Sequence, residues 1–100
     1  MEYEVRLLPK ANVDLVEIDT NLADFPQKAR RLFLALDKQI ALLREMPQMY
    51  PVYEDVPAFR KMVVLDFLVF YTVDDTAREI LIHRMRPGRM DYYETMSAEE

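Results

Sequence analysis

The stretch Lys61-Met-Val-Val-Leu-Asp-Phe-Leu-Val-Phe-Tyr-Thr-Val73 decides the fold. Lys61–Leu65 is rich in β-branched and apolar residues, and Asp66 marks a tight turn. Phe67–Val73 is apolar on both faces, which is typical of a central strand covered on at least one side. These residues therefore predict two strands joined by a turn at Asp66.

A third strand and a tail follow toward the C-terminus. Arg78–Arg86 predicts a strand that comes after a turn at Asp74–Thr76 and ends at Pro87-Gly88. Residues 91–100 form an acidic tail, which we expect to be mobile or bound to a partner. Strict alternation divides the strand's apolar residues between two faces: Ile80 and Ile82 on one, Leu81 and Met85 on the other.

The N-terminal half predicts one strand and two helices. Glu2–Leu8 alternates charged and apolar residues, so it predicts a strand with one buried face. Pro9–Phe25 and Pro26–Leu43 repeat apolar residues at steps of three and four, as amphipathic helices do. Because Pro26 interrupts the first pattern and opens the second, the helices should form an antiparallel hairpin. The first stripe consists of Ala11, Leu15, Ile18, Leu22 and Phe25, and the second of Ala29, Leu32, Phe33, Leu36, Ile40 and Leu43.

The predicted elements define an α+β fold. Residues 47–58 carry three prolines and no periodicity, which indicates a loop before the strands. The order is N-terminal strand, antiparallel helix hairpin, then three antiparallel strands (β-α-α-β-β-β). We expect residues 1–90 to form one domain, with the first strand placed among the C-terminal ones in one sheet.

Composition excludes several classes of protein. The 100 residues contain no Cys, one His (His83) and one Ser (Ser97), which removes disulfide scaffolds and thiolate zinc sites and argues against a serine triad. No apolar run is long enough to span a membrane, and the charged start Glu2–Arg6 is unlike a signal peptide. We therefore expect a cytoplasmic protein without a metal or cofactor.

The charge is unevenly distributed. The net charge is −5, yet residues 58–90 carry six basic and four acidic side chains. An acidic chain gains little from phosphate neutralisation, so nonspecific nucleic-acid binding is not expected. A local basic patch near the C-terminal end remains compatible with a small anionic site.

A set of short motifs is distributed over nearly the whole chain. Their order and spacing across residues 2–91 resemble the RelE/ParE superfamily, the toxins of type II toxin–antitoxin pairs. No single motif is specific. The motifs are Tyr3–Pro9, Asp14–Ile18, Pro47 with Met49, Arg60 with Val63-Val64, Asp66-Phe67 and Val69-Phe70-Tyr71, and Ile80–Arg84 with Gly88-Arg89 and Asp91.

The resemblance implies one of two activities. RelE-like members cut mRNA in the ribosomal decoding site without a metal, which needs a base, an acid and cations near the phosphate. ParE-like members poison DNA gyrase by protein contact. This chain has Leu68 where the nucleases usually carry an Arg. It has Pro87 where they usually carry a further Arg or a His. It therefore resembles a ParE-like toxin that inhibits growth, with a RelE-like endonuclease or a degenerate, non-toxic binding module as alternatives.

Candidate site residues follow from the resemblance. We expect Arg60 and Arg84 to lie near each other on one sheet face, because one opens a strand and the other closes one. The alternative is a purely structural role, in which both arginines bind carbonyls or carboxylates of this chain. We interpret His83 as a structural residue and Tyr71 as a core residue. Contacts to a target or antitoxin would use Arg60, Arg84, Arg86, Arg89 and Tyr92, whereas a nuclease would use Arg60, Arg84, Arg86 and Tyr93.

The resemblance also implies partners. A cognate antitoxin would wrap over apolar helix surface such as Val13 and Val16, over the loop at Met49–Tyr53, and over the basic segment Arg84–Arg89. The target would be DNA gyrase, or the ribosome with its mRNA in the nuclease alternative. No membrane is expected to take part.

Overall fold

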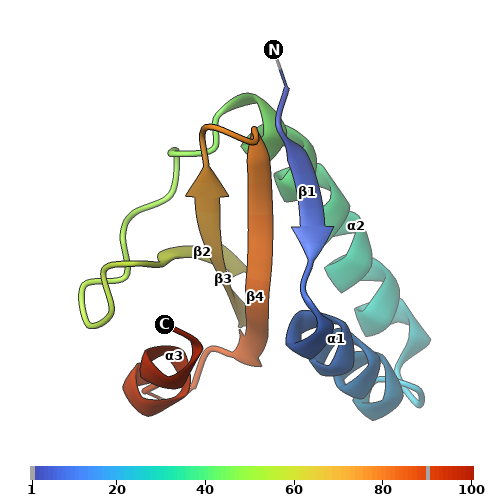
Figure 1. Cartoon of the computed structure of the whole chain (residues 1–100). Coiled ribbons are helices and arrows are strands. Elements are labelled where there is room, and N and C mark those ends of the chain that lie inside the picture. Colours follow the sequence, from blue (N-terminus) through green and yellow to red (C-terminus); the bar gives the residue numbers. More distant parts are fainter. Residues whose placement is uncertain (1, 90) are drawn as a thin grey trace.

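The computed structural model describes residues 2–89 and 91–100 (Figure 1). Its radius of gyration of 13.2 Å is that of a compact domain of this length. The elements are β1 (Glu4–Leu7), α1 (Pro9–Asn21), α2 (Pro26–Glu45), β2 (Arg60–Val64), β3 (Phe67–Asp74), β4 (Glu79–Pro87) and α3 (Tyr93–Glu99).

A mixed four-stranded sheet forms the centre of the fold. Its strand order is β1-β4-β3-β2, so the first and last strands in sequence are neighbours. β1 runs parallel to β4, and the other two pairs are antiparallel. The predicted α+β class and the order β-α-α-β-β-β are confirmed, with the N-terminal strand at the edge beside the C-terminal one.

Helices α1 and α2 cover one face of this sheet (Figure 1). Each begins with proline, whose missing N–H costs nothing in a first turn and whose fixed φ suits a helix. The main core between helices and sheet contains Ala11, Ile18, Leu32, Leu36, Leu43, Met62, Val64, Val69, Tyr71, Ile80, Ile82 and Met85. No helix in the described part of the chain is long and apolar enough to cross a membrane.

A second, smaller core covers part of the opposite face. It joins the proline-rich loop to the C-terminal segment, and its members are Tyr53, Val56, Phe59, Phe70, Tyr92 and Met96. The segment expected to be a mobile or partner-bound tail forms helix α3 here, with Met96 fully buried. A seven-residue helix gains most of its stability from packing rather than from propensity. The signal in the sequence is the i, i+4 pair Tyr92 and Met96, which the acidic composition obscured.

An irregularity in β4 corrects the predicted alternation. Phe70 lies opposite Arg84 while Tyr71 lies opposite Ile82, so His83 is an extra residue in β4. A bulge of this kind reverses which residues face the core from that point onward. Met85 therefore joins Ile82 beneath the helices, and the prediction that these two side chains lie on opposite faces is wrong.

Candidate functional site

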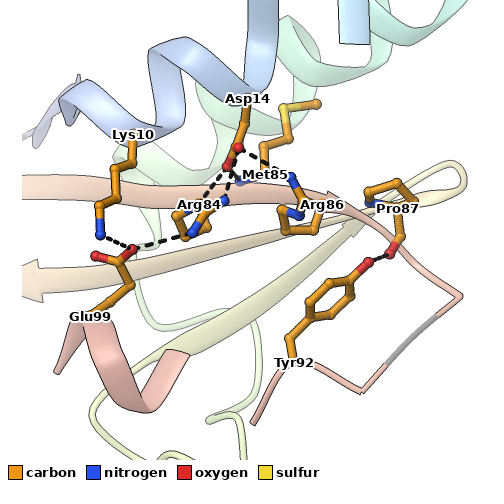
Figure 2. Close-up of polar contacts among 8 residues, drawn as sticks. All are labelled: Lys10, Asp14, Arg84, Met85, Arg86, Pro87, Tyr92 and Glu99. Carbon is orange, nitrogen blue, oxygen red and sulfur yellow. Dashed lines mark hydrogen bonds and ion pairs between the residues drawn. The ribbon is translucent and has the colours of Figure 1, made fainter. Parts of the chain in front are cut away.

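Two predicted arginines meet a buried carboxylate where β4 extends beyond the end of β1. Arg84 donates to Asp14 of α1 through Nε at 2.7 Å and Nη2 at 3.0 Å, a two-pronged ion pair (Figure 2). Arg86 donates to the same carboxylate at 3.3 Å through Nη1. Asp14 also accepts the Met85 backbone N–H at 3.0 Å, a donor that has no strand beside it because β1 pairs only with residues 79–82.

Asp14 is the member of this site that the sequence did not single out. Its exposed fraction is 3%, and it lies three residues after Ala11 and four before Ile18 on the buried stripe of α1. Burial alone would raise the pKa of Asp14. Hydrogen bonds from Arg84 and the Met85 N–H, together with the charges of Arg84 and Arg86, outweigh burial and hold that pKa below its ordinary value. An acid inside an apolar stripe is the signal that could have predicted this site.

Helix α3 supplies a second carboxylate to the same place. Glu99 accepts from Arg84 Nη1 at 3.3 Å and from Lys10 Nζ at 2.9 Å (Figure 2). We call Lys10, Asp14, Arg84, Arg86 and Glu99 the Asp14 cluster. The Asp14 hydrogen bond raises the pKa of Arg84 further, so this guanidinium stays charged. With three cations and two carboxylates, the cluster has little charge left to offer a ligand while Glu99 is in place.

Arg60 lies elsewhere and does not join Arg84, contrary to the expectation. It donates to the carbonyl oxygens of Tyr50 at 2.7 Å and of Gln48 at 3.4 Å, and so fastens the loop to the start of β2. Beside it, the Tyr71 hydroxyl donates to the Pro47 carbonyl at 2.9 Å. Burial raises the pKa of Tyr71 to about 12, in keeping with its interpretation as a core residue. Both side chains organise the loop.

The remaining candidates differ in accessibility. Tyr92 is buried, donates from its hydroxyl to the Pro87 carbonyl, and has the Arg86 guanidinium 6.0 Å from its ring centroid (Figure 2). Tyr93 next to it is 51% exposed. Arg89 is exposed and lines an open hollow on the sheet. Tyr92 therefore anchors α3, whereas Tyr93 and Arg89 are presented to solvent.

His83 is positioned as a structural residue. Its Nε2 lies 2.9 Å from Thr72 Oγ1, and its ring meets the edge of Phe59 with centroids 4.9 Å apart. Burial lowers the pKa of His83, against a smaller opposing attraction to Glu99, so the imidazole is neutral at pH 7. Among residues 2–89 and 91–100 its hydrogen-bond partner is the Thr72 hydroxyl, and no carboxylate is bonded to it.

The uncovered part of the sheet face combines aliphatic and charged side chains. Val63, Leu68 and Arg86 follow one another across β2, β3 and β4 in register, so one cation stands beside two aliphatic side chains. An open hollow of about 380 Å³ lies here, bordered by Val63, Leu68, Gly88 and Arg89. The described residues contain no group of three His, Cys, Asp or Glu side chains that could hold a metal.

Comparison with known proteins identifies this architecture. Several solved structures share the fold, and the three described here are at most 22% identical to this chain. The chromosomal ParDE system from P. aeruginosa gives a TM-score of 0.69 and 22% identity over 86% of this chain and 96% of that chain. The RelBE2 toxin–antitoxin complex from Mycobacterium tuberculosis gives a TM-score of 0.60 and 19% identity over 87% of this chain and 99% of that chain. A mutant of the E. coli RelE toxin in the free state gives a TM-score of 0.72 and 12% identity over 99% of this chain and 97% of that chain.

The fold is thus that of the RelE/ParE class of toxins. A family profile described as the ParE toxin of the type II toxin–antitoxin system parDE matches residues 5–92. The chain therefore belongs to the ParE toxin family of type II toxin–antitoxin systems. A sequence comparison with curated proteins gives no match.

Proposed function

We propose that this protein is a cytoplasmic, growth-inhibiting toxin that acts on DNA gyrase by protein contact and is neutralised by a cognate antitoxin. The observation that carries the proposal is the sheet face around Leu68. There the register sets an aliphatic residue beside Arg86, and the neighbouring Arg84 is already bound by Asp14 and Glu99. Family membership supports the toxin class, and the aliphatic residues Val63 and Leu68 in register with Arg86 favour a protein as its target.

The side chains support contact rather than RNA cleavage. Metal-free cleavage at a 2′-hydroxyl needs a base, an acid and cations aimed at the phosphorus. His83 is occupied by Thr72 and neutral, Arg60 is bound to loop carbonyls, and Leu68 offers no charge. Tyr93 is the exposed candidate acid or base that the nuclease alternative retains.

An antitoxin is a fitting partner for this chain. The similar structures include a ParDE system and a RelBE2 complex described as toxin–antitoxin assemblies. The exposed apolar residues Val13 and Val16 on α1, each about two-thirds exposed, offer surface that a partner would cover. A toxin with such a surface would be co-purified with its antitoxin.

Controlled expression of the chain alone tests the proposal. Growth, DNA supercoiling and mRNA integrity would be followed together, in the wild type, Arg86→Ala/Arg89→Ala and Lys38→Ala. We expect growth arrest with gyrase-linked DNA damage, intact transcripts, and at least about tenfold weaker gyrase inhibition by the purified arginine variant. Lys38 is an exposed cation on α2 and serves as the matched control.

Three outcomes contradict the proposal. Codon-spaced mRNA cuts that Tyr93→Phe abolishes would establish the nuclease alternative. Absence of growth arrest would point to a binding module without toxicity. Equal gyrase inhibition by the arginine variant and the wild type would remove Arg86 and Arg89 from the contact.

A further inference from the structure

The turn between β2 and β3 holds a leucine in an unfavourable backbone conformation. Leu65 has φ of 53°, in the left-handed region where a Cβ crowds the following carbonyl. Gly or Asn would occupy this position with less strain. The Leu65 side chain is nevertheless 48% exposed, so burial of this side chain within the chain does not offset the backbone strain.

Leu65 separates two hollows. One, of about 150 Å³, lies between the turn and the start of α2, and its walls include Leu22, Leu32, Leu65 and Phe67. We call it the tip hollow. The other is the open hollow on the sheet face, bordered by Val63, Leu68 and Arg89. A space of about 150 Å³ holds a ring the size of benzene, so the tip hollow accommodates one apolar side chain.

Cations border both hollows. Lys28 and Arg31 border the tip hollow, and Arg89 borders the hollow on the sheet face. Within residues 2–89 and 91–100 none of these three side chains forms an ion pair, whereas Arg84 and Arg86 do. Asp66 is the single acid that lines the two hollows. In a chain of net charge −5, this end of the molecule therefore attracts an acidic partner.

The turn is held in place from the far side. The Gly88 N–H donates to the Asp66 carbonyl at 2.8 Å, and a Cβ at Gly88 would lie 3.1 Å from that oxygen. The turn is thereby attached to the end of β4, next to Arg89. A fixed apolar tip with cations on both sides lowers the ordering cost of binding.

We propose that the Leu65–Asp66 turn is a docking point for an acidic segment of the antitoxin. One Leu- or Phe-sized side chain of that segment fills the tip hollow beside Leu65, and its carboxylates bind Lys28 and Arg31. This inference rests on the antitoxin partnership proposed above and is independent of the toxin's target. The apolar walls of the tip hollow favour a polypeptide over a nucleic acid, whose backbone would offer it only phosphate and sugar.

The experiment measures the affinity of the purified toxin for the full-length antitoxin encoded beside its gene. Four variants are compared: Leu65→Asn, Leu65→Met, Lys28→Glu/Arg31→Glu, and Lys38→Glu as the matched charge reversal outside the hollow. Unfolding temperature and toxicity without antitoxin are measured on the same proteins. Asn tolerates a positive φ, so Leu65→Asn removes the apolar contact without a folding penalty.

We expect Leu65→Asn and Lys28→Glu/Arg31→Glu each to weaken antitoxin binding about tenfold or more at an unchanged unfolding temperature. Toxicity should be maintained in Lys28→Glu/Arg31→Glu, because these two residues line the tip hollow and not the hollow on the sheet face. Leu65→Met and Lys38→Glu should stay within about twofold of the wild type. Three results overturn the proposal: unchanged affinity of Leu65→Asn, loss of toxicity with affinity retained, or no antitoxin binding by the wild type. A toxin that spares gyrase but shows the expected affinities would refute the proposed target and leave this docking point standing.

Discussion

The two faces of the sheet are built in different ways. On one face, α1 and α2 lie over β-strands in a continuous core made by regular helical and strand periodicity. On the other, a proline-rich loop and the short α3 cover only part of the sheet, and the rest stays open around Leu68. The first face is a scaffold that stabilises the domain. The second leaves part of the sheet open to partners, and its coverage depends on a few anchors.

The Asp14 cluster joins the two faces, and the largest expected effect comes from breaking it. Asp14→Ala leaves Arg84 without its two-pronged partner and the Met85 N–H without an acceptor. Removing one member of a buried ion pair costs about 3 kcal/mol or more. Chemical denaturation would measure the loss. Asp19→Ala, an exposed acid on the same helix, should change stability by less than about 0.5 kcal/mol. Equal losses in the two variants would show that Asp14 is merely a surface acid.

Detaching α3 would separate the faces in a second way. Met96 is fully buried in the smaller core, so Met96→Ala should cost about 2 kcal/mol. Because α3 is short and is held mainly by the smaller core, we expect the loss to concentrate there. Hydrogen exchange should accelerate in the α3 amides far more than in those of β3. Uniform acceleration would instead show that both cores unfold as one unit, and Glu94→Ala on the exposed side of α3 is the control.

Sequence patterns predicted the scaffold face and missed much of the other. Period two in Glu2–Leu8 and steps of three and four after Pro9 are local signals, and local signals suffice for strands and amphipathic helices. The bulge at His83 depends on cross-strand register, which no single strand reveals. The pairing of Asp14 with Arg84 spans 70 residues, and the helix at Tyr93–Glu99 depends on a core assembled from distant segments. The sequence singled out these arginines by residue type, but it could not predict the side chains that they contact.

A milder change tests whether α3 screens Arg84. Glu99→Gln keeps the size of the side chain but removes its charge from Arg84 and Lys10. The cost should be about 1 kcal/mol, because Asp14 still holds Arg84. If the screening matters, purified Glu99→Gln should bind sulfate or phosphate more tightly than the wild type in a calorimetric titration. Glu100→Gln, at the chain end, is the control. Unchanged anion affinity would show that Glu99 only fastens α3.

The mildest test sharpens the comparison by pH alone. His83 belongs to the partly covered face, and burial lowers its pKa below the ordinary value near 6.5. The unfolded chain therefore binds a proton there more readily than the folded one, so stability is full above about pH 6.5 and falls as pH drops below it. His83→Gln should flatten the dependence of the unfolding free energy on pH between pH 7 and pH 5. The loss of stability that comes from Asp14 should stay unchanged, because the lowered pKa of Asp14 acts near pH 4 and below. Glu99→Gln should steepen the same dependence, because the Glu99 charge opposes the lowering of the His83 pKa. If His83→Gln and the wild type show the same slope, the imidazole is solvated in the folded protein, and the smaller core does not exclude water from this part of the sheet.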